Sequence, residues 1–191
     1  RWLEDHGELP ELPLVAMVPV SIRTGDETEK WTNRVSSIFA TLPTDEPDPL
    51  LRVARVHDAM VDAKSLFDAV PADALTDFAQ FPPPAVFARA MRTATRLSAS
   101  RFMPPVNVTI SNVPGPRQSL YTAGARMLHY YPVSTIVDGQ GLNITVQSYL
   151  DSLDFGLVAC RELVPDLWDL LAAIIDDLGE LGKAAGVDTV R

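Results

Sequence analysis

The chain has 191 residues, of which 47% are hydrophobic and 21% are charged, a composition typical of one globular domain or one lobe of a larger enzyme. Its 25 acidic residues outnumber its 16 basic ones and give a net charge of −9, which argues against a nucleic-acid-binding protein and against a polybasic membrane anchor. The single cysteine, Cys160, excludes an internal disulfide framework and favours the reducing cytoplasm.

The first 67 residues predict a helix end, two strands and a helix. Residues 1–7 resemble the last turns of a helix that Gly7 ends. Residues 14–23 and 33–42 are predicted strands, and Pro19 suggests that the first lies at an edge or a bulge. Neither side of the second strand is purely polar, so we expect both of its faces to be covered. Residues 24–32 form a polar loop, and the acids and prolines of residues 44–49 start a helix that continues to Phe67.

Two further helices are predicted before the centre of the chain. The first is short and covers residues 73–78, and the second covers residues 85–100. Arginines at spacings of three and four form a stripe along the second helix, namely Arg89, Arg92 and Arg96. In an otherwise acidic chain this stripe has two interpretations, a contact for the phosphates of a ligand or a solvated helix face.

Residues 106–116 predict a strand that leaves its sheet abruptly. Apolar and polar residues alternate from Val106 to Ser111, the pattern of a half-buried strand. Pro114, Gly115 and Pro116 then force the chain into a rigid loop, with Ser111 and Asn112 at its root. This exit is either one wall of a cleft or an ordinary strand end with a tight turn.

The last third of the chain predicts strands followed by one amphipathic helix. The strands cover residues 125–131, 133–137, 142–150 and 154–160, and the last two form a hairpin. The helix starts at Pro165, ends near Gly182 and has a leucine-rich face. The whole chain therefore predicts an α+β fold, a mixed sheet of six or seven strands with helices mostly on one face.

Three motifs, in this order, resemble the carboxy-terminal half of the bacterial wax ester synthase/diacylglycerol acyltransferase family. They are residues 111–116 (Ser-Asn-Val-Pro-Gly-Pro), residues 131–134 (Tyr-Pro-Val-Ser) and residues 141–149 (Gly-Leu-Asn-Ile-Thr-Val-Gln-Ser-Tyr). The resemblance also takes in residues 14–23 and 33–36. It implies that residues 1–191 are one lobe of a chloramphenicol-acetyltransferase-like fold, in which a substrate tunnel runs between two lobes. The chain begins with Arg1 rather than methionine, so we expect it to be part of a longer protein.

The family's catalytic motif, H-H-x-x-x-D-G, does not occur in this chain. Its histidine would act as the general base, a task that suits imidazole near neutral pH. His6, His57 and His129 are single and far apart, so we expect structural roles for them and no catalytic residue in this chain. We also expect no metal site, since no histidine or carboxylate cluster has ligand spacing. Asp154-Phe155-Gly156 resembles the magnesium triplet of kinases, but no glycine-rich loop or catalytic-loop motif accompanies it. It also resembles a motif of CoA acyltransferases, but Leu157 replaces the tryptophan of that motif and the position is a late hairpin strand, so we reject both interpretations.

The resemblance implies that the candidate tunnel residues belong to the central loop and to one later strand, namely Ser111, Asn112, Pro114, Gly115, Pro116 and Asn143. Asn143 either faces the tunnel or is paired within the sheet. The arginine stripe is a candidate for the phosphates of coenzyme A. No cofactor is expected beyond acyl-CoA as a co-substrate.

The function implied by the resemblance is transfer of a long-chain acyl group from CoA to diacylglycerol or a fatty alcohol, in triacylglycerol or wax ester synthesis. The partner would be the amino-terminal lobe, and the protein would be cytoplasmic, with association at the inner membrane or at lipid droplets. Two alternatives remain open, a non-catalytic lipid-binding or interaction lobe and a condensation-type acyltransferase of peptide or polyketide assembly.

Overall fold

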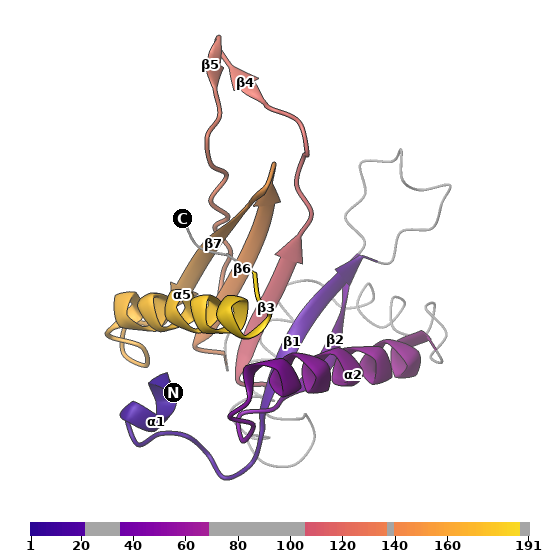
Figure 1. The fold of residues 1–191 in the computed structure, drawn as a ribbon, viewed down its shortest axis with the longest axis vertical. Coiled ribbons are helices and arrows are strands. Elements are labelled where there is room, and N and C mark those ends of the chain that lie inside the picture. Colours follow the sequence, from indigo (N-terminus) through magenta and orange to yellow (C-terminus); the bar gives the residue numbers. More distant parts are fainter. Residues whose placement is uncertain (22–34, 69–105, 137–139, 188–191) are drawn as a thin grey trace, which may run out of the picture.

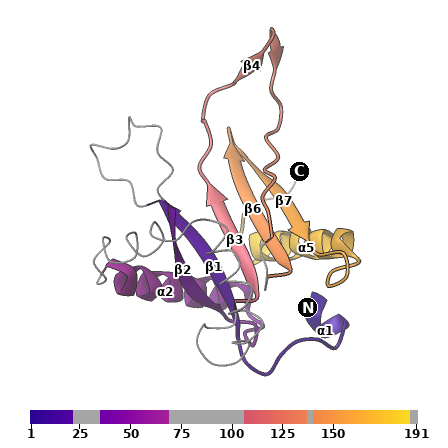
Figure 2. The same ribbon diagram turned by 180° about the vertical axis from the view of Figure 1, so that it is seen from behind.

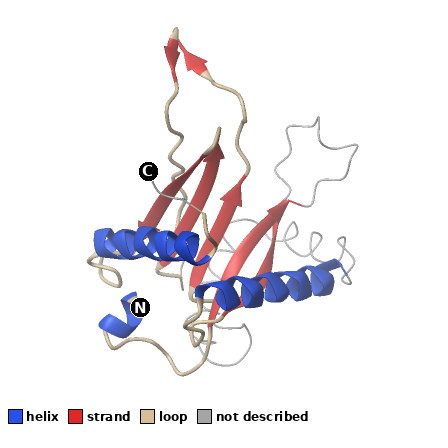
Figure 3. Cartoon of the chain, viewed as in Figure 1, coloured by secondary structure: helices blue, strands red, loops and turns tan. Residues whose placement is uncertain are grey.

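A five-stranded mixed sheet carries two long helices on one of its faces (Figures 1 and 3). The computed structural model describes residues 1–21, 35–68, 106–136 and 140–187. The sheet has the order β2-β1-β3-β6-β7. Its strands are β1 (Leu14–Ser21), β2 (Val35–Leu42), β3 (Val108–Val113), β6 (Leu142–Tyr149) and β7 (Ser152–Ala159). The helices are α2 (Pro49–Asp68) and α5 (Leu167–Ala184). This arrangement confirms the predicted α+β class.

Three neighbouring strands of the sheet run in the same direction. β1 pairs parallel with β3, and β3 pairs parallel with β6. β2 and β7 are antiparallel to their neighbours and form the two edges. The carboxyl ends of β1, β3 and β6 therefore meet at one end of the sheet, and the loop after β3 leaves from there.

The apolar core lies between the sheet and the helices. Strand register places Ala16, Ala40 and Val108 on one face, and all three are buried together with Ile38. The opposite face of β2 is less covered, since Phe39 keeps 40% of its surface exposed. The described residues therefore leave that side of β2 partly uncovered, whereas we expect cover on both faces.

The start of α2 follows the predicted pattern. Pro49 is the first helical residue, a position where the missing N–H of proline costs nothing. The Asp48 carboxylate accepts hydrogen bonds from the N–H groups of Leu50 and Leu51 at 2.8 and 3.0 Å, and thereby caps the helix.

Pro19 lies where β1 is locally an edge. The pairing between β1 and β2 is continuous through Pro19, so β1 has no bulge there. The pairing between β1 and β3, however, extends only from Ala16 to Met17. Pro19 lies beyond that short ladder, which is where a residue without an N–H is tolerated.

The predicted strands 125–131 and 133–137 are wrong in most of their length. The structure has two short strands, β4 (Tyr121–Thr122) and β5 (Ala125–Arg126), joined by a turn in which Ala123 and Gly124 have positive φ, as in the common two-residue hairpin turn. Residues 127–136 form no strand. They follow the face of the sheet opposite the helices, where side chains of β6 and β7 bind them (Figure 2).

The amino terminus is helical, as the sequence predicts. A short helix, α1 (Trp2–Asp5), ends before Gly7, which has a positive φ of 67° as expected for a helix stop. The predicted loop 24–32, the short helix 73–78 and the helix 85–100 lie outside the described residues. In the part of the chain that the structure describes, no helix is long and apolar enough to cross a membrane.

Candidate functional site

The loop after β3 is packed directly on the end of β6. The Gly115 N–H donates a hydrogen bond to Ser148 Oγ at 2.8 Å, and the Leu150 N–H donates one to the Pro116 carbonyl at 3.1 Å. A Cβ added to Gly115 would lie 1.7 Å from the Ser148 carbonyl oxygen. Only glycine therefore allows the Pro-Gly-Pro segment to approach the backbone of β6 this closely.

Ser111 and Asn112 point to opposite faces of the sheet. β3 continues through Val113, so successive side chains alternate between the two faces. Ser111 is opposite Thr145 on the face away from the helices, and Asn112 is opposite Val146 on the helix face. Ser111 is half-buried, whereas Asn112 is exposed. The two side chains therefore cannot line one and the same wall.

The amide of Asn143 is hydrogen-bonded to one residue of the sheet and to two residues of the segment that covers it. Its Nδ2 donates hydrogen bonds to Ser134 Oγ at 3.2 Å and to the Thr135 carbonyl at 3.0 Å. Its Oδ1 accepts one from Thr145 Oγ1 at 2.9 Å. Asn143 is 5% exposed, so its side chain fixes residues 134 and 135 to the sheet.

Asn143 belongs to a buried polar layer on the sheet face away from the helices. The other members are Thr109, Thr145, Gln147 and Asp154. In the sequence, the alternation of polar and apolar residues in β6 is typical of a strand with one solvated face. Residues 127–136 instead cover this face (Figure 2). The alternation can be read from the sequence, but the segment that covers the polar face cannot.

Asp154 and Gly156 hold that covering segment against β7. The buried Asp154 carboxylate accepts a hydrogen bond from the Tyr130 N–H at 2.6 Å and lies 3.1 Å from His129 Nδ1. A Cβ added to Gly156 would lie 1.8 Å from the Pro132 carbonyl oxygen. The Asp-Phe-Gly triplet therefore has a structural explanation, a carboxylate that binds the segment and a glycine that makes room for it.

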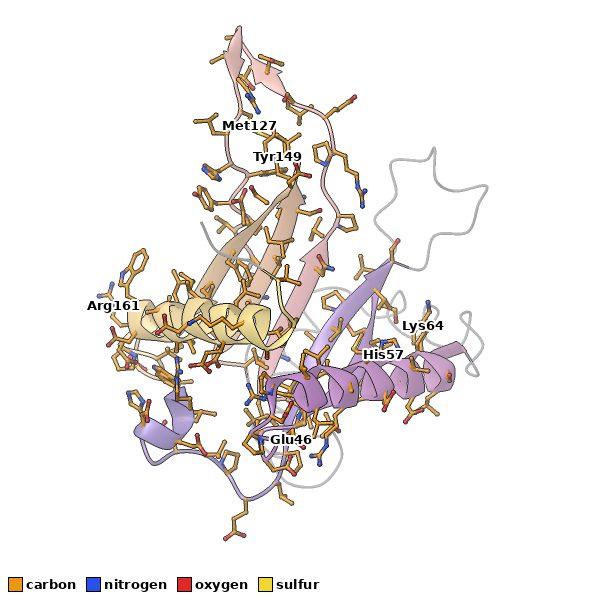
Figure 4. All side chains as sticks on the ribbon, in the orientation of Figure 1. Glu46, His57, Lys64, Met127, Tyr149 and Arg161 are labelled. Atoms are coloured by element: carbon orange, nitrogen blue, oxygen red, sulfur yellow. The ribbon has the colours of Figure 1, made fainter. Side chains whose placement is uncertain are left out.

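Tyr149 fixes the start and the end of the hairpin that contains β4 and β5. It is 1% exposed, and Figure 4 shows it beside Met127. Its hydroxyl donates to the Met127 carbonyl and accepts from the Leu120 N–H, both at 3.0 Å. One side chain thus joins the two residues that flank β4 and β5 to the end of β6.

His6 joins α1 to the residue before α5. Its Nδ1 lies 2.7 Å from the Trp2 carbonyl oxygen and its Nε2 lies 2.9 Å from Asp166 Oδ2. The hydrogen bond to Trp2, and next the charge of Asp166, raise the pKa of His6 above its ordinary value of 6.5. Both contacts favour a ring that carries two protons.

The described residues contain no group of three histidine, cysteine or carboxylate side chains that could hold a metal ion. His57 lies on the exposed part of α2 (Figure 4). The arginine stripe, Arg89, Arg92 and Arg96, lies outside the described residues.

Comparison with known proteins gives matches along nearly the whole chain. Residues 31–182 match the family model described as the WS/DGAT C-terminal domain. A putative diacylglycerol O-acyltransferase of Mycobacterium tuberculosis is 43% identical over 188 residues, which are 98% of this chain and 41% of that protein. The O-acyltransferase WSD of Acinetobacter baylyi is 38% identical over 197 residues, which cover 100% of this chain and 41% of that protein.

One solved structure has the same fold at substantial sequence identity. It is the wax ester synthase/diacylglycerol acyltransferase from Marinobacter aquaeolei, with a TM-score of 0.72 and 32% identity over 97% of this chain and 40% of that one. This chain therefore spans about two fifths of the length of the relatives that it matches. It belongs to the wax ester synthase/diacylglycerol acyltransferase family and corresponds to the carboxy-terminal domain of its members.

Proposed function

We propose that the protein to which this chain belongs is an acyl-CoA-dependent O-acyltransferase. It transfers a long-chain acyl group from CoA to the hydroxyl of diacylglycerol or a fatty alcohol and thus makes triacylglycerol or wax esters. The observation that carries this proposal is the match of residues 31–182 to the carboxy-terminal domain of the family, together with relatives named as diacylglycerol O-acyltransferases. Acyl-CoA is a co-substrate, and the reaction takes no cofactor.

In this proposal the chain is one lobe, residues 1–191, and the preceding lobe supplies the general base from its H-H-x-x-x-D-G motif. His6 and His129 are each held by an aspartate that links two segments of the fold, which is what a structural role requires. Holding thioester and hydroxyl together removes entropy from the barrier, and excluding water suppresses hydrolysis. The carboxy-terminal lobe therefore contributes positioning rather than proton transfer.

The end of β3 and the loop after it, residues 111–116, are the candidate part of the tunnel wall in this chain. The backbone of the loop is fixed by Ser148 and Leu150, and a wall that orients two substrates has to be rigid. Asn112 is the exposed polar side chain of this wall and is the candidate for substrate contact, whereas Asn143 supports the wall from within. The arginine stripe stays the candidate for the phosphates of coenzyme A.

Contact with a lipid surface is part of the same proposal. Diacylglycerol and fatty alcohols are dissolved in membranes or lipid droplets, so an enzyme that uses them has to reach that surface. We therefore propose a cytoplasmic protein that associates peripherally. Flotation of the full-length protein with phosphatidylglycerol vesicles that contain diacylglycerol measures this, and a protein that stays with the soluble fraction contradicts it.

An assay of the full-length protein with matched acyl donors tests the function. We expect transfer from long-chain acyl-CoA to diacylglycerol or a fatty alcohol and none from carrier-protein-bound acyl groups. Transfer from the carrier-bound donor alone would establish the condensation-type alternative. Lipid binding without transfer from either donor would establish the non-catalytic lobe.

A further inference from the structure

Gln147 differs from the other side chains of the buried polar layer in having no polar partner. The other members are each hydrogen-bonded to a further residue, namely Thr109, Asn143, Thr145 and Asp154. Gln147 is as deeply buried as they are, with 6% of its surface exposed. Its side chain nevertheless forms no hydrogen bond with any residue that the structure describes. Burial of an unpaired carboxamide costs folding free energy, so a stability role does not explain this residue.

Gln147 lies beside the candidate tunnel wall. It is close to the carboxyl end of β6, a strand that runs parallel to β3, and ligands of parallel sheets bind at this end of the strands. Strand register places Val113 next to it on β3 and Asp154 next to it on β7. A Cβ added to Gly115 would lie 2.7 Å from Gln147 Nε2. The amide is therefore packed against the Pro-Gly-Pro loop.

The amide of Gln147 can still be reached from outside the fold. Among the described residues, the unpaired side-chain atoms that are fully enclosed belong to Trp2 and Asp166. The amide atoms of Gln147 are not fully enclosed in this way, and the neighbouring Val113 keeps 40% of its surface exposed. A polar group beside an exposed apolar side chain is the combination by which a mostly apolar site orients its ligand.

The surroundings of Gln147 favour a neutral oxygen as its ligand. The buried carboxylate of Asp154 is its neighbour on β7 and would repel a phosphate or a carboxylate. A carboxamide offers two donor hydrogens and an acceptor oxygen, which suit carbonyl and hydroxyl groups. In the proposed reaction the reacting hydroxyl has to lie at the general base of the preceding lobe. The oxygen that remains for Gln147 is therefore one that does not react.

We propose that the Gln147 amide donates a hydrogen bond to an ester carbonyl of diacylglycerol and thereby favours diacylglycerol over a fatty alcohol. Diacylglycerol has ester carbonyls close to its hydroxyl, whereas a fatty alcohol has only hydrocarbon there. A site that binds a polar group discriminates against a substrate without it, because the amide then stays unpaired. The inference rests on the proposed function and specifies its alcohol substrate. It adds a contact on the sheet face opposite Asn112.

Calorimetric titration of the full-length protein with dioctanoylglycerol and with dodecanol tests the proposal. Gln147→Met keeps the length of the side chain and removes its hydrogen bonding. We expect this change to weaken the binding of dioctanoylglycerol about tenfold relative to that of dodecanol, which is the loss of one hydrogen bond. The ratio of the kcat/KM values for the two alcohols should fall by the same factor, and the affinity for long-chain acyl-CoA should stay at its wild-type value.

Thermal unfolding of the same variant separates a ligand contact from a structural role. Because the Gln147 amide has no partner among the described residues, Gln147→Met should unfold at the wild-type temperature or above it. Gln140→Met is the matched control, since the Gln140 amide accepts a hydrogen bond from Thr109 Oγ1 and precedes the opposite end of β6. This control should unfold at a lower temperature and leave the ratio of the two alcohols unchanged.

Each other outcome overturns the proposal. Equal losses for both alcohols would assign Gln147 to the shape of the site, and weaker binding of acyl-CoA would assign its amide to the acyl donor. A lower unfolding temperature of Gln147→Met would show that the amide is bonded within the fold. Binding and transfer are measured separately, so wild-type protein that binds dioctanoylglycerol through Gln147 without acyl transfer refutes only the proposed function. An active enzyme whose ratio of alcohols does not depend on Gln147 refutes only this inference.

Discussion

At the scale of single residues, two positions of this domain require glycine because a neighbouring backbone carbonyl leaves no room for a side chain, and not because of a turn. Gly115 and Gly156 would each place a Cβ within 2 Å of a backbone oxygen, at 1.7 Å and 1.8 Å. A backbone oxygen in a strand or a proline-flanked segment cannot rotate away as a side chain can. The two glycines therefore set how closely the central loop and the covering segment approach the sheet.

Gly115→Ala should destabilise the domain by about 3 kcal/mol, the upper end of what overpacking costs. Gly141→Ala is the matched control, because its Cβ would meet the side chain of Leu163, which is exposed and can turn away. That change should stay within about 0.5 kcal/mol. Denaturant unfolding of both variants measures the difference, and equal stability of the two would refute the close packing of the loop.

His6 makes the docking of α1 depend on pH. Its pKa in the folded protein is raised above 6.5 by the hydrogen bond to Trp2 and by the charge of Asp166. A raised pKa means that the stabilisation is fully present below 6.5 and is lost as the pH rises through the folded-state pKa. Wild type should therefore exceed His6→Gln in stability at pH 6 by more than it does at pH 8.

The same contact can be followed by NMR titration of the His6 ring. Asp166→Asn should lower the pKa of His6 toward 6.5, since the carboxylate contributes to the shift. A wild-type pKa at or below 6.5 would contradict the contact of His6 with Trp2 and Asp166.

A feature of the candidate site could be predicted only where all the residues that produce it lie in one short stretch of sequence. Gly115 between two prolines predicts a rigid loop by itself, even though the position of β6 is not known from that stretch. The sequence leaves two arrangements open for Asn143, because its partners, Ser134 and Thr135, lie in a segment whose residues suggest a strand instead. The triplet that contains Asp154 resembles two motifs that do not apply here, and the structural role of Asp154 depends on how residues 127–136 return across the sheet.

At the scale of elements, the strands with a hydrophobic period were predicted and the covering segment was not. β6 and β7 have boundaries within two residues of the predicted ones, since apolar and polar residues alternate along β6 as its side chains point in turn to the two faces of the sheet. Residues 127–136 also contain apolar and aromatic residues, which suggest strands. Their backbone is bound by the side chains of Asn143 and Asp154 instead of by a neighbouring strand, and no sequence pattern distinguishes these two cases.

Tyr149→Phe should loosen the root of the projecting hairpin, residues 117–131 or the arm, while leaving the sheet intact. The phenol hydroxyl makes two hydrogen bonds to the backbone of the arm, so its removal should cost about 1–3 kcal/mol of unfolding free energy. Tyr121→Phe is the matched control, because Tyr121 is exposed, and it should be neutral. Thermal unfolding measures both variants, and a Tyr149→Phe protein as stable as wild type would show that the hydroxyl does not hold the arm.

At the scale of the whole molecule, the two faces of the sheet serve different purposes. The helix face buries small and branched apolar side chains and makes the core. The other face is polar over β3, β6 and β7 and is covered by residues 127–136, which follow the projecting hairpin of β4 and β5 (Figure 2). The general class was therefore predictable from the periodicity of the chain, whereas the asymmetry of the two faces required the structure.

The central claim is that this domain positions substrates and supplies no catalytic base. The measurement that tests it most directly is acyl transfer from long-chain acyl-CoA to diacylglycerol, by this chain alone and by this chain with the preceding lobe supplied. We expect no transfer by the chain alone and transfer when the preceding lobe is added. In the presence of that lobe, the His129→Gln chain should transfer at a rate within a few-fold of the wild-type rate. Full activity of the isolated chain, or its loss in His129→Gln while the fold is retained, would contradict the claim.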